Sequence, residues 1–301
     1  MKHGFLILTH FPPEKIYNQI RRLQSPGHYF FIHFDKKQNI DITNHFYKEL
    51  AAMDNVTIVT ERINVRWGSV MMLNATLELI RYALKRTDIG YMHLLSGECL
   101  HVKSIKYIHD FFEKNKGKEF IDQFLMPVKS KDHGLTYKRI DKYHLYNFFD
   151  FKSKKMKDVV IRNINSLFRK LQRGLKLIGI YRRYSSKLPV LYAGSQWWSL
   201  SSAACKYCID YLDSNPEFYN RIKYSQIPDE FVFQTIIMNS SFRENVAGDN
   251  LRFIDFIGAT SHPHELTMKY IPGLAKENKL FARKFTAASN ELLEYLDKNV
   301  Y

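Results

Sequence analysis

The sequence predicts an α/β protein in which parallel strands carry helices on both faces. Short apolar runs alternate four times with longer segments whose apolar residues recur at the spacing of a helix. Such alternation is typical of βαβ units. The chain has 301 residues, of which 45% are hydrophobic, enough to bury a large core.

Each predicted element can be read from its own segment. The four strands are FLILTH (5–10), YFFIHFD (29–35), NVTIVTE (55–61) and GYMHLLSGE (90–98). The four helices that follow them occupy 14–24, 44–53, 69–86 and 104–114. Strand signals return near the end of the chain, in LPVLYAG (188–194), QWWSLS (196–201) and LRFIDFIG (251–258).

The residues that follow the strands are the first candidates for a binding site. Ligands of open α/β sheets collect at the carboxyl ends of the strands. His10, Asp35, Arg66 and Gly97 follow the first four strands. A carboxylate such as Asp35 at a strand end often contacts a nucleotide ribose, but the same residue also commonly begins a turn.

A basic segment interrupts the α/β pattern. Residues 152–187 hold twelve Lys or Arg and one acid, Asp158, with apolar residues interleaved at helical spacing. This pattern predicts an amphipathic helix. Two interpretations remain open: a solvated helix that packs on the sheet, and a helix that lies on an anionic membrane or binds a lipid-phosphate acceptor.

The overall composition limits the class of protein. The net charge of +15 favours polyanionic partners, although the sequence carries no recognisable nucleic-acid-binding module. Three cysteines make a disulfide framework improbable and suit a reducing compartment. The first apolar run is too short for a signal peptide, and no stretch approaches the ~20 apolar residues of a membrane span. We therefore expect a cytoplasmic protein, with a peripheral membrane contact left open.

Metal-binding signals are weak. No aspartate stands two residues from another, so the Asp-X-Asp pair with which many nucleotide-sugar transferases hold a divalent metal is absent. Cys205 and Cys208 have zinc-like spacing, but they fit the apolar face of a helix and we expect them to be buried structural residues. The run from His262 to Glu265 favours a cap or an anion contact over a metal.

Three further stretches have side chains suited to sugar or phosphate. AGSQWWSLS places Ser195 before Trp197 and Trp198; adjacent strand residues face opposite ways, so one indole can join the core while the other stacks on a sugar. KLFARKF has two interpretations. Arg283 or Lys284 could contact a phosphate, or the stretch could be an amphipathic turn at the surface.

IPDEFVFQTI begins a helix with a proline and two acids. It is either a capped core helix or a carboxylate held at a cleft to remove a proton. Glu230 is the candidate base and Asp229 is its rival.

Taken in order, these stretches resemble the core-2/I-branching β-1,6-N-acetylglucosaminyltransferase and peptide O-xylosyltransferase family, glycosyltransferase family 14. The strongest matches are GSQWW, PDEF and LFARKF. The resemblance implies a GT-A-like, Rossmann-like fold with a mixed sheet in a single domain, 1–301. We expect a nucleotide-sugar-binding half at 3–125, a basic helical insertion at 126–187 and an acceptor and catalytic half at 188–301.

The resemblance also implies an inverting transferase that uses a UDP-sugar and needs no metal or other cofactor. Glu230 would be the catalytic base. Lys284 would contact the donor diphosphate with Arg283 and an upstream arginine, best matched by Arg252, for which His262 could substitute. The nucleotide contacts would be His10, Asp35, Arg66 and Gly97, and the acceptor contacts Ser195, Trp197, Trp198 and Asp229.

The implied reaction moves N-acetylglucosamine or xylose to a hydroxyl of an oligosaccharide or lipid-linked saccharide, in cell-surface polysaccharide synthesis. We expect the enzyme in the cytoplasm, with a peripheral contact at the inner face of an anionic membrane and no nucleic-acid partner. Two alternatives from other classes remain: a basic protein that binds nucleic acid or another polyanion, and a catalytically inactive scaffold that binds UDP-sugar.

Overall fold

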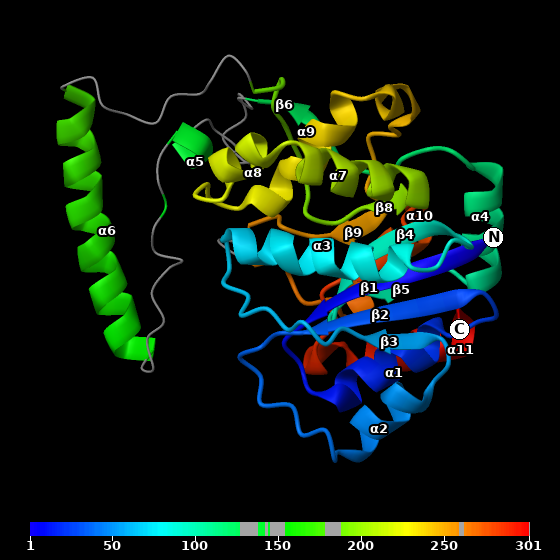
Figure 1. Ribbon diagram of the computed structural model, residues 1–301. Coiled ribbons are helices and arrows are strands. Elements are labelled where there is room, and N and C mark those ends of the chain that lie inside the picture. The colour runs from blue at the N-terminus through cyan, green and yellow to red at the C-terminus, as the bar shows by residue number, and fades with distance from the viewer. Residues whose placement is uncertain (127–137, 142–143, 145–153, 178–187, 259–261, 301) are drawn as a thin grey trace.

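A computed structural model describes residues 1–126, 138–141, 144, 154–177, 188–258 and 262–300. The main sheet has five strands in the order β3-β2-β1-β4-β8 (Figure 1). The first four are parallel, and β8 runs antiparallel beside β4. The predicted mixed α/β sheet flanked by helices is confirmed. The strands are β1 (Lys2–Thr9), β2 (His28–Phe34), β3 (Val56–Ile58), β4 (Ile89–Ser96) and β8 (Ser199–Ser201).

Alternation along β1 divides the core into two layers. Leu6 and Leu8 belong to the cluster that α3 (Val70–Leu84) and α7 (Ser202–Ser214) complete. Phe5 and Ile7 belong to the opposite cluster, which α1 (Pro13–Leu23) and α4 (Ile105–Lys114) complete. Successive strand residues face opposite sides, so a continuous apolar run fills both layers.

Two smaller sheets attach to the main one. The first has the order β5-β10-β9, from β5 (Leu100–His101), β10 (Phe281–Arg283) and β9 (Arg252–Ile254). The second pairs β6 (Phe124–Leu125) with β7 (Tyr192–Ala193). The expected halves of the chain are interleaved, because β8 completes the main sheet while β5 joins the second one.

The remaining helices surround these sheets. α6 is the basic helix that the sequence predicts, and Cys205 and Cys208 on α7 are buried as expected. The remaining elements are α2 (His45–Ala52), α5 (Lys138–Asp141), α6 (Lys154–Leu177), α8 (Pro216–Ile222), η1 (Pro228–Glu230), α9 (Val232–Met238), η2 (Ser241–Asn245), η3 (Met268–Tyr270), α10 (Ile271–Lys276), η4 (Ala287–Ser289) and α11 (Asn290–Asn299).

Candidate active site

The carboxyl ends of β1, β2 and β4 meet at one edge of the sheet, as expected for parallel strands. The backbone N–H of Asp35 donates to the Thr9 carbonyl across 2.8 Å, which fixes the end of β2 beside that of β1. Asp35 Oδ1 accepts from the backbone N–H groups of Lys37 (2.9 Å) and Val65 (3.3 Å). The side chain thus ties together the loops after β2 and β3. A nucleotide contact for Asp35 stays a prediction.

His10 and Gly97 lie at the same edge. His10 is exposed, and its ring lies 4.2 Å from that of Phe11 between centroids. A Cβ on Gly97 would come within 2.7 Å of Thr9 Oγ1 and 2.9 Å of Ile16 Cδ1. Any larger residue would push β4 away from β1 and the start of α1. Gly97 is therefore needed for close packing, and its predicted nucleotide contact stays untested.

Three cations gather beyond β4. The backbone N–H of Phe285 donates to the Glu98 carbonyl across 3.0 Å, which brings the end of β10 to the end of β4. Arg283 lies 3.7 Å from the Glu98 carboxylate. Lys15, in the first turn of α1, donates to the Phe285 carbonyl across 3.4 Å. Burial lowers the pKa of Lys15, and the charge of Lys284 lowers it further.

We call Lys15, Arg283 and Lys284 the cationic cluster. Among the described residues, the one ion pair of Lys284 is long, 3.9 Å, and joins it to the half-exposed Glu265. The sequence reasoning missed Lys15. A lysine in the first turn of the helix that follows a strand can indicate a site residue, since that turn lies at the same edge of the sheet as the strand end.

Arg252 does not fit the predicted contact with a donor diphosphate. Its side chain is 3% exposed and lies in the core. The guanidinium donates to Ser199 Oγ (2.7 Å) and to the carbonyls of Trp198 (2.6 Å), Leu94 (3.2 Å) and Asn250. Because these bonds join β9 to β4 and β8, the role of Arg252 is structural. Burial also lowers its pKa to about 9.

Backbone hydrogen bonds fix the chain before Glu230 and at Glu230 itself. Ile227, just before η1, has a left-handed φ of 53°, and its N–H donates to the Gly68 carbonyl across 2.8 Å. The Glu230 carbonyl accepts from the Gly194 N–H, also at 2.8 Å. A Cβ on Gly194 would collide with the Asp122 carbonyl, so this contact needs glycine. The expected proline-led turn is confirmed, although the α-helix itself begins at Val232.

The Glu230 side chain is partly exposed and has a cation against one of its two oxygens. Arg139 Nη1 donates to Oε2 across 2.7 Å, and no hydrogen bond from the described residues reaches Oε1. The Glu230 side chain is 32% exposed and that of Arg139 is 15% exposed. Arg139 belongs to α5 in the basic insertion, and its carbonyl accepts from the Gln226 N–H at 2.9 Å. Motif matching missed Arg139, because its segment matches the family poorly.

Asp229 occupies a different environment from its neighbour. Its side chain is buried, and within the described chain Oδ1 has no hydrogen-bond partner. Burial, and next the charge of Glu230, raise the pKa of Asp229 to about 7. Burial of this kind favours the protonated, uncharged form of the Asp229 carboxyl. The exposed and ion-paired Glu230 is the better placed base, and Asp229 is too enclosed for the predicted acceptor contact.

The segment from Gly194 to Trp198 connects Glu230 to the cationic cluster. The Ser195 carbonyl accepts from Gln234 Nε2 on α9 (2.7 Å), and its hydroxyl accepts from the Trp197 N–H (3.2 Å). The Arg283 guanidinium lies over the Trp197 ring, 4.8 Å from its centroid. Trp198 is fully buried, so the prediction that it binds acceptor does not fit its position in the core. An acceptor contact for Ser195 or Trp197 stays a prediction.

Trp67 is a candidate that sequence reasoning missed. It is 70% exposed and precedes Gly68, whose carbonyl holds the turn before Glu230. Its half-buried neighbour Arg66 keeps its predicted nucleotide role as an untested expectation, while the Arg66 carbonyl accepts from Ser69 at the start of α3. An exposed indole in the loop that is bonded to the turn before Glu230 is suited to stack on a sugar ring.

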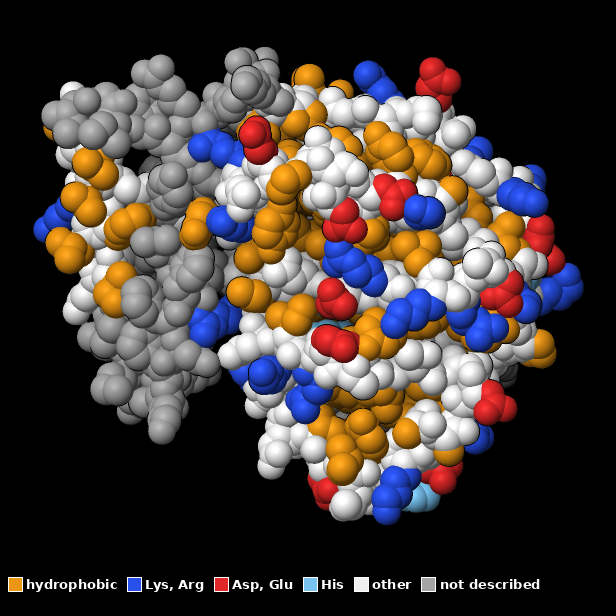
Figure 2. Space-filling model, viewed as in Figure 1, with side chains coloured by type: hydrophobic (Ala, Val, Ile, Leu, Met, Phe, Trp, Pro, Cys, Tyr) orange, Lys and Arg blue, Asp and Glu red, His pale blue; other side chains and the backbone are white. Residues whose placement is uncertain are grey.

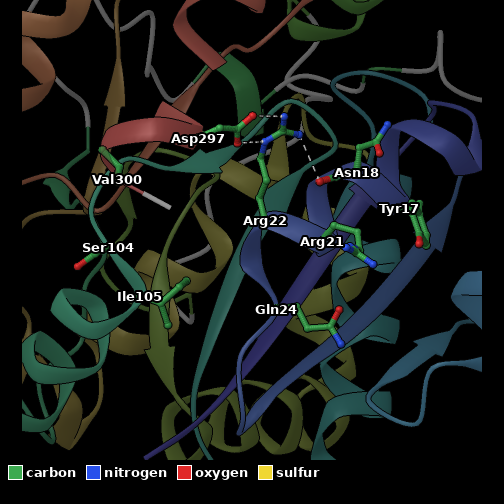
Figure 3. Close-up of a pocket in the computed structure, with 9 residues that line it drawn as sticks. All are labelled: Tyr17, Asn18, Arg21, Arg22, Gln24, Ser104, Ile105, Asp297 and Val300. Atoms are coloured by element: carbon green, nitrogen blue, oxygen red, sulfur yellow. Dashed lines mark hydrogen bonds and ion pairs between the residues drawn. The ribbon is translucent and has the colours of Figure 1, made fainter. Parts of the chain in front are cut away.

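A large cavity of about 920 Å³ lies at the other edge of the sheet. There Arg22 makes a two-pronged ion pair with Asp297, 2.8 and 2.9 Å, and also donates to the Asn18 carbonyl (Figure 3). The carboxyl end of α1 and the start of α4 form its walls, away from Glu230 and the cationic cluster. Its lining residues are Tyr17, Asn18, Arg21, Arg22, Gln24, Ser104, Ile105, Asp297 and Val300.

Among the described residues, no group of three or more His, Cys, Asp or Glu side chains is arranged to hold a metal ion. In the run that contains His262, His264 Nε2 lies 2.7 Å from the Ile257 carbonyl and the Glu265 carboxylate lies beside Lys284. These residues therefore shape the loop next to the cationic cluster.

Comparisons with known proteins point to a family. Xylosyltransferase 2 of Rattus norvegicus is 24% identical over 303 residues, which cover 91% of this chain and 31% of the rat protein. Xylosyltransferase oxt of Drosophila pseudoobscura pseudoobscura is 23% identical, over 92% of this chain and 30% of its own length. The chain thus spans about a third of the length of these relatives.

A profile of the Core-2/I-Branching enzyme family matches residues 4–277, nearly the whole chain. This range includes every element that positions Glu230 and Arg139, and it includes the strands that form the carboxyl edge. The chain therefore belongs to the Core-2/I-branching enzyme family of glycosyltransferases.

Proposed function

We propose that this protein is an inverting glycosyltransferase that moves a sugar from a UDP-sugar to a saccharide hydroxyl without a metal. The observation that carries this proposal is the pairing of Glu230 with Arg139 beside the segment that leads to the cationic cluster. A base and a set of cations are what this reaction needs from a protein.

Glu230 Oε1 acts as the general base. It takes the proton from an acceptor hydroxyl as the hydroxyl oxygen forms a bond to the anomeric carbon of the donor. The bond from that carbon to the phosphate oxygen breaks on the opposite side, and UDP leaves with the bonding electron pair. The configuration at the anomeric carbon is therefore inverted. Base catalysis of this kind contributes about 10²–10⁴-fold.

The cationic cluster offsets the negative charge that grows on the departing diphosphate. Arg283 offers a planar fork of donors, and its stacking on Trp197 restricts its motion. Lys15 and Lys284 add point charges. Fixed cations at developing charge stabilise the transition state more than the ground state, which is the role a divalent metal plays in other transferases.

The donor sugar is N-acetylglucosamine or xylose in this proposal. Support comes from the family match and from relatives that are named xylosyltransferases. Trp67, which is 70% exposed, is the aromatic side chain that we assign to the donor or acceptor sugar, while Trp197 is buried beside Arg283. The free, buried cysteines suit our expectation of a cytoplasmic enzyme in cell-surface polysaccharide synthesis.

The test is UDP release from a panel of nucleotide sugars, with and without excess EDTA. Slow donor hydrolysis is a sufficient readout, because it needs no acceptor. We expect release from UDP-N-acetylglucosamine or UDP-xylose, little from GDP- or CMP-sugars, and no change with EDTA. Activity abolished by EDTA and restored by added Mn²⁺ or Mg²⁺ would contradict the metal-free mechanism.

The same samples separate the alternatives. UDP binding by calorimetry with no turnover for any donor would favour the inactive scaffold. Absence of UDP binding together with tight, salt-sensitive binding to random duplex DNA would favour a nucleic-acid-binding protein. Neither result is expected.

A further inference from the structure

We propose that α6 is a docking helix for an anionic membrane surface. Its apolar side would enter the boundary between lipid headgroups and acyl chains, and its basic side would contact the lipid phosphates. This interaction surface does not depend on the proposed function, so each can fail without the other.

The apolar side of α6 is partly exposed. Ile164, Leu167, Phe168, Leu171 and Leu175 recur at spacings of three and four and therefore form one stripe. Leu167 is 70% exposed and Leu171 is 53% exposed. Hydrophobic side chains are visible along the outer surface of this helix at the left of Figure 2. Within the described residues the stripe is therefore only partly covered, since Ile164, Phe168 and Leu175 are half-buried and Leu167 and Leu171 are mostly exposed.

A comparison with α1 shows how unusual this is. The apolar residues Ile16, Ile20 and Leu23 of α1 follow the same periodicity, yet all three are fully buried against the sheet. In Figure 1, α6 stands apart from the sheet and the helices that cover it. The similar periodicity with much lower burial at Leu167 and Leu171 suits a second surface that covers α6 in the working protein.

The charge of the molecule is concentrated on and around this helix. α6 carries eight Lys or Arg and one acid, and residues 152–187 hold a surplus of eleven positive charges out of fifteen for the whole chain. At 100° per residue, Arg173 lies on the side opposite the apolar stripe and Lys170 lies at its flank, and both are exposed. A leucine-rich stripe with a basic opposite side is typical of helices that lie in the interface of an anionic bilayer.

Two other occupants fit less well. A nucleic acid would use the cations but would leave the aliphatic stripe uncovered, because base and phosphate surfaces do not bury leucine well. A second copy of α6 would cover the stripe, but it would bring together two helices that each carry a surplus of seven positive charges. A bilayer with anionic lipids satisfies both faces at once.

The position of α6 in the chain links the membrane to the candidate site. The helix follows α5, which supplies Arg139 to Glu230, and it precedes β7, next to which Gly194 holds the Glu230 backbone. A membrane surface against α6 would hold the enzyme on the bilayer that carries lipid-linked acceptors. None of the described helices is long and apolar enough to span a bilayer, so the proposed contact is peripheral.

The test is flotation of the full chain with vesicles of phosphatidylcholine alone or with about one-third phosphatidylglycerol, at low and moderate salt. We expect binding to the anionic vesicles only, weakening as salt rises. The charge variant R169Q/K170Q/R173Q should weaken binding about a hundredfold, from about fivefold for each basic residue removed near the surface. The apolar variant L167E/L171E should abolish it.

Matched controls are available outside α6. K114Q/K116Q/K118Q removes three exposed charges from another part of the surface, and I42E places an acid at another exposed apolar residue. Both should bind as the wild type does. Circular dichroism of every variant reports whether the fold is kept.

Three outcomes would overturn the proposal. The first is equal loss of binding in the charge variant and in its control, which would indicate an effect of net charge alone. The second is a dimer of the wild type that L167E/L171E dissociates while neither protein binds vesicles, which would assign the stripe to a second copy. The third is no vesicle binding together with binding of duplex DNA that the charge variant loses.

Discussion

The two edges of the main sheet hold polar side chains in opposite states. At the carboxyl edge, Lys284 and Glu230 keep partial exposure and only single ion-pair contacts. At the amino edge, His3 and His28 are buried and their rings lie against one another. Both edges use residues that can carry charge. Only the carboxyl edge leaves that charge within reach of a ligand.

The histidines at the amino edge are neutral for a physical reason. Burial lowers the pKa of His3 to about 2 and that of His28 to about 4, and it lowers the pKa of His93 as well. His3 Nδ1 lies 2.9 Å from His93 Nε2, and His93 Nδ1 lies 2.8 Å from Ser199 Oγ. The chain of polar contacts stabilises the core but offers no free group to chemistry.

The largest expected effect is a loss of folding stability in acid, which comes from the buried histidines at the amino edge. A histidine whose folded pKa lies below its unfolded value of about 6.5 gains a proton on unfolding. The free energy of unfolding therefore falls as the pH falls. His3, His28 and His93 together should lower the free energy of unfolding by about 4 kcal/mol between pH 5.5 and 4.5.

Asp229 opposes this acid effect. Its folded pKa of about 7 lies above its unfolded value, so it adds about 1.4 kcal/mol of stability over the same interval. Other buried groups shift in both directions. Urea unfolding at the two pH values should show a net loss of stability at pH 4.5, unchanged in the exposed-histidine control H45Q. A flat profile would show that the buried histidines do not govern acid stability.

Removing a cation tests the carboxyl edge. Lys284→Ala should lower kcat/KM for the UDP-sugar about a hundredfold, because one fixed charge on the diphosphate is lost. Lys279→Ala is the matched control from the same stretch, since Lys279 pairs with Asp249 across 2.8 Å instead. Steady-state UDP release measures both. Equal losses would indicate that the stretch matters for folding and not for charge.

Arg139 tests the link between the insertion and the base. Arg139→Gln should lower kcat about tenfold, because the ion pair that orients Glu230 is lost, while the dissociation constant for UDP stays unchanged. Arg139→Lys should recover part of the loss. Arg81→Gln removes a surface ion pair of equal length, 2.7 Å, and should leave kcat unchanged. A change in UDP affinity alone would assign Arg139 to the donor.

The smallest expected effect concerns the exposed indole. Trp67→Ala should raise KM for a sugar substrate about fivefold, in line with one lost stacking contact. Tyr107→Ala, an exposed aromatic on α4, is the control. Titration of donor and acceptor separately tells which sugar Trp67 contacts, and unchanged KM for both would remove it from the site.

The sequence is most informative where a local pattern decides the structure. The period of the apolar residues predicted the first four strands and helices, and PDEF marked the turn that carries Glu230. The position of the polar end of a long, buried side chain could not be predicted in this way. Arg252 matches a family arginine by its neighbours, yet β9 directs it into the core, where four oxygens take its donors.

Arg139 was not predicted from the sequence, yet it contacts Glu230 at the candidate site. It comes from a stretch with no motif, 91 residues before Glu230, and only the tertiary fold brings the two together. Trp198 failed for a related reason, since alternation allows one indole to face a cleft but both Trp197 and Trp198 lie inside the packed layers. Contacts between distant segments are set by packing, which a single sequence does not display.

The central claim is that Glu230, and not Asp229, removes the acceptor proton. The most direct measurement is kcat for UDP release by Glu230→Gln and Asp229→Asn under the same conditions, with UDP affinity measured alongside. We predict a loss of at least about a hundredfold for Glu230→Gln. For Asp229→Asn we predict a loss below about tenfold, because asparagine resembles the protonated carboxyl that burial favours. Near-normal kcat in Glu230→Gln, or an equal loss in both variants, would contradict the claim.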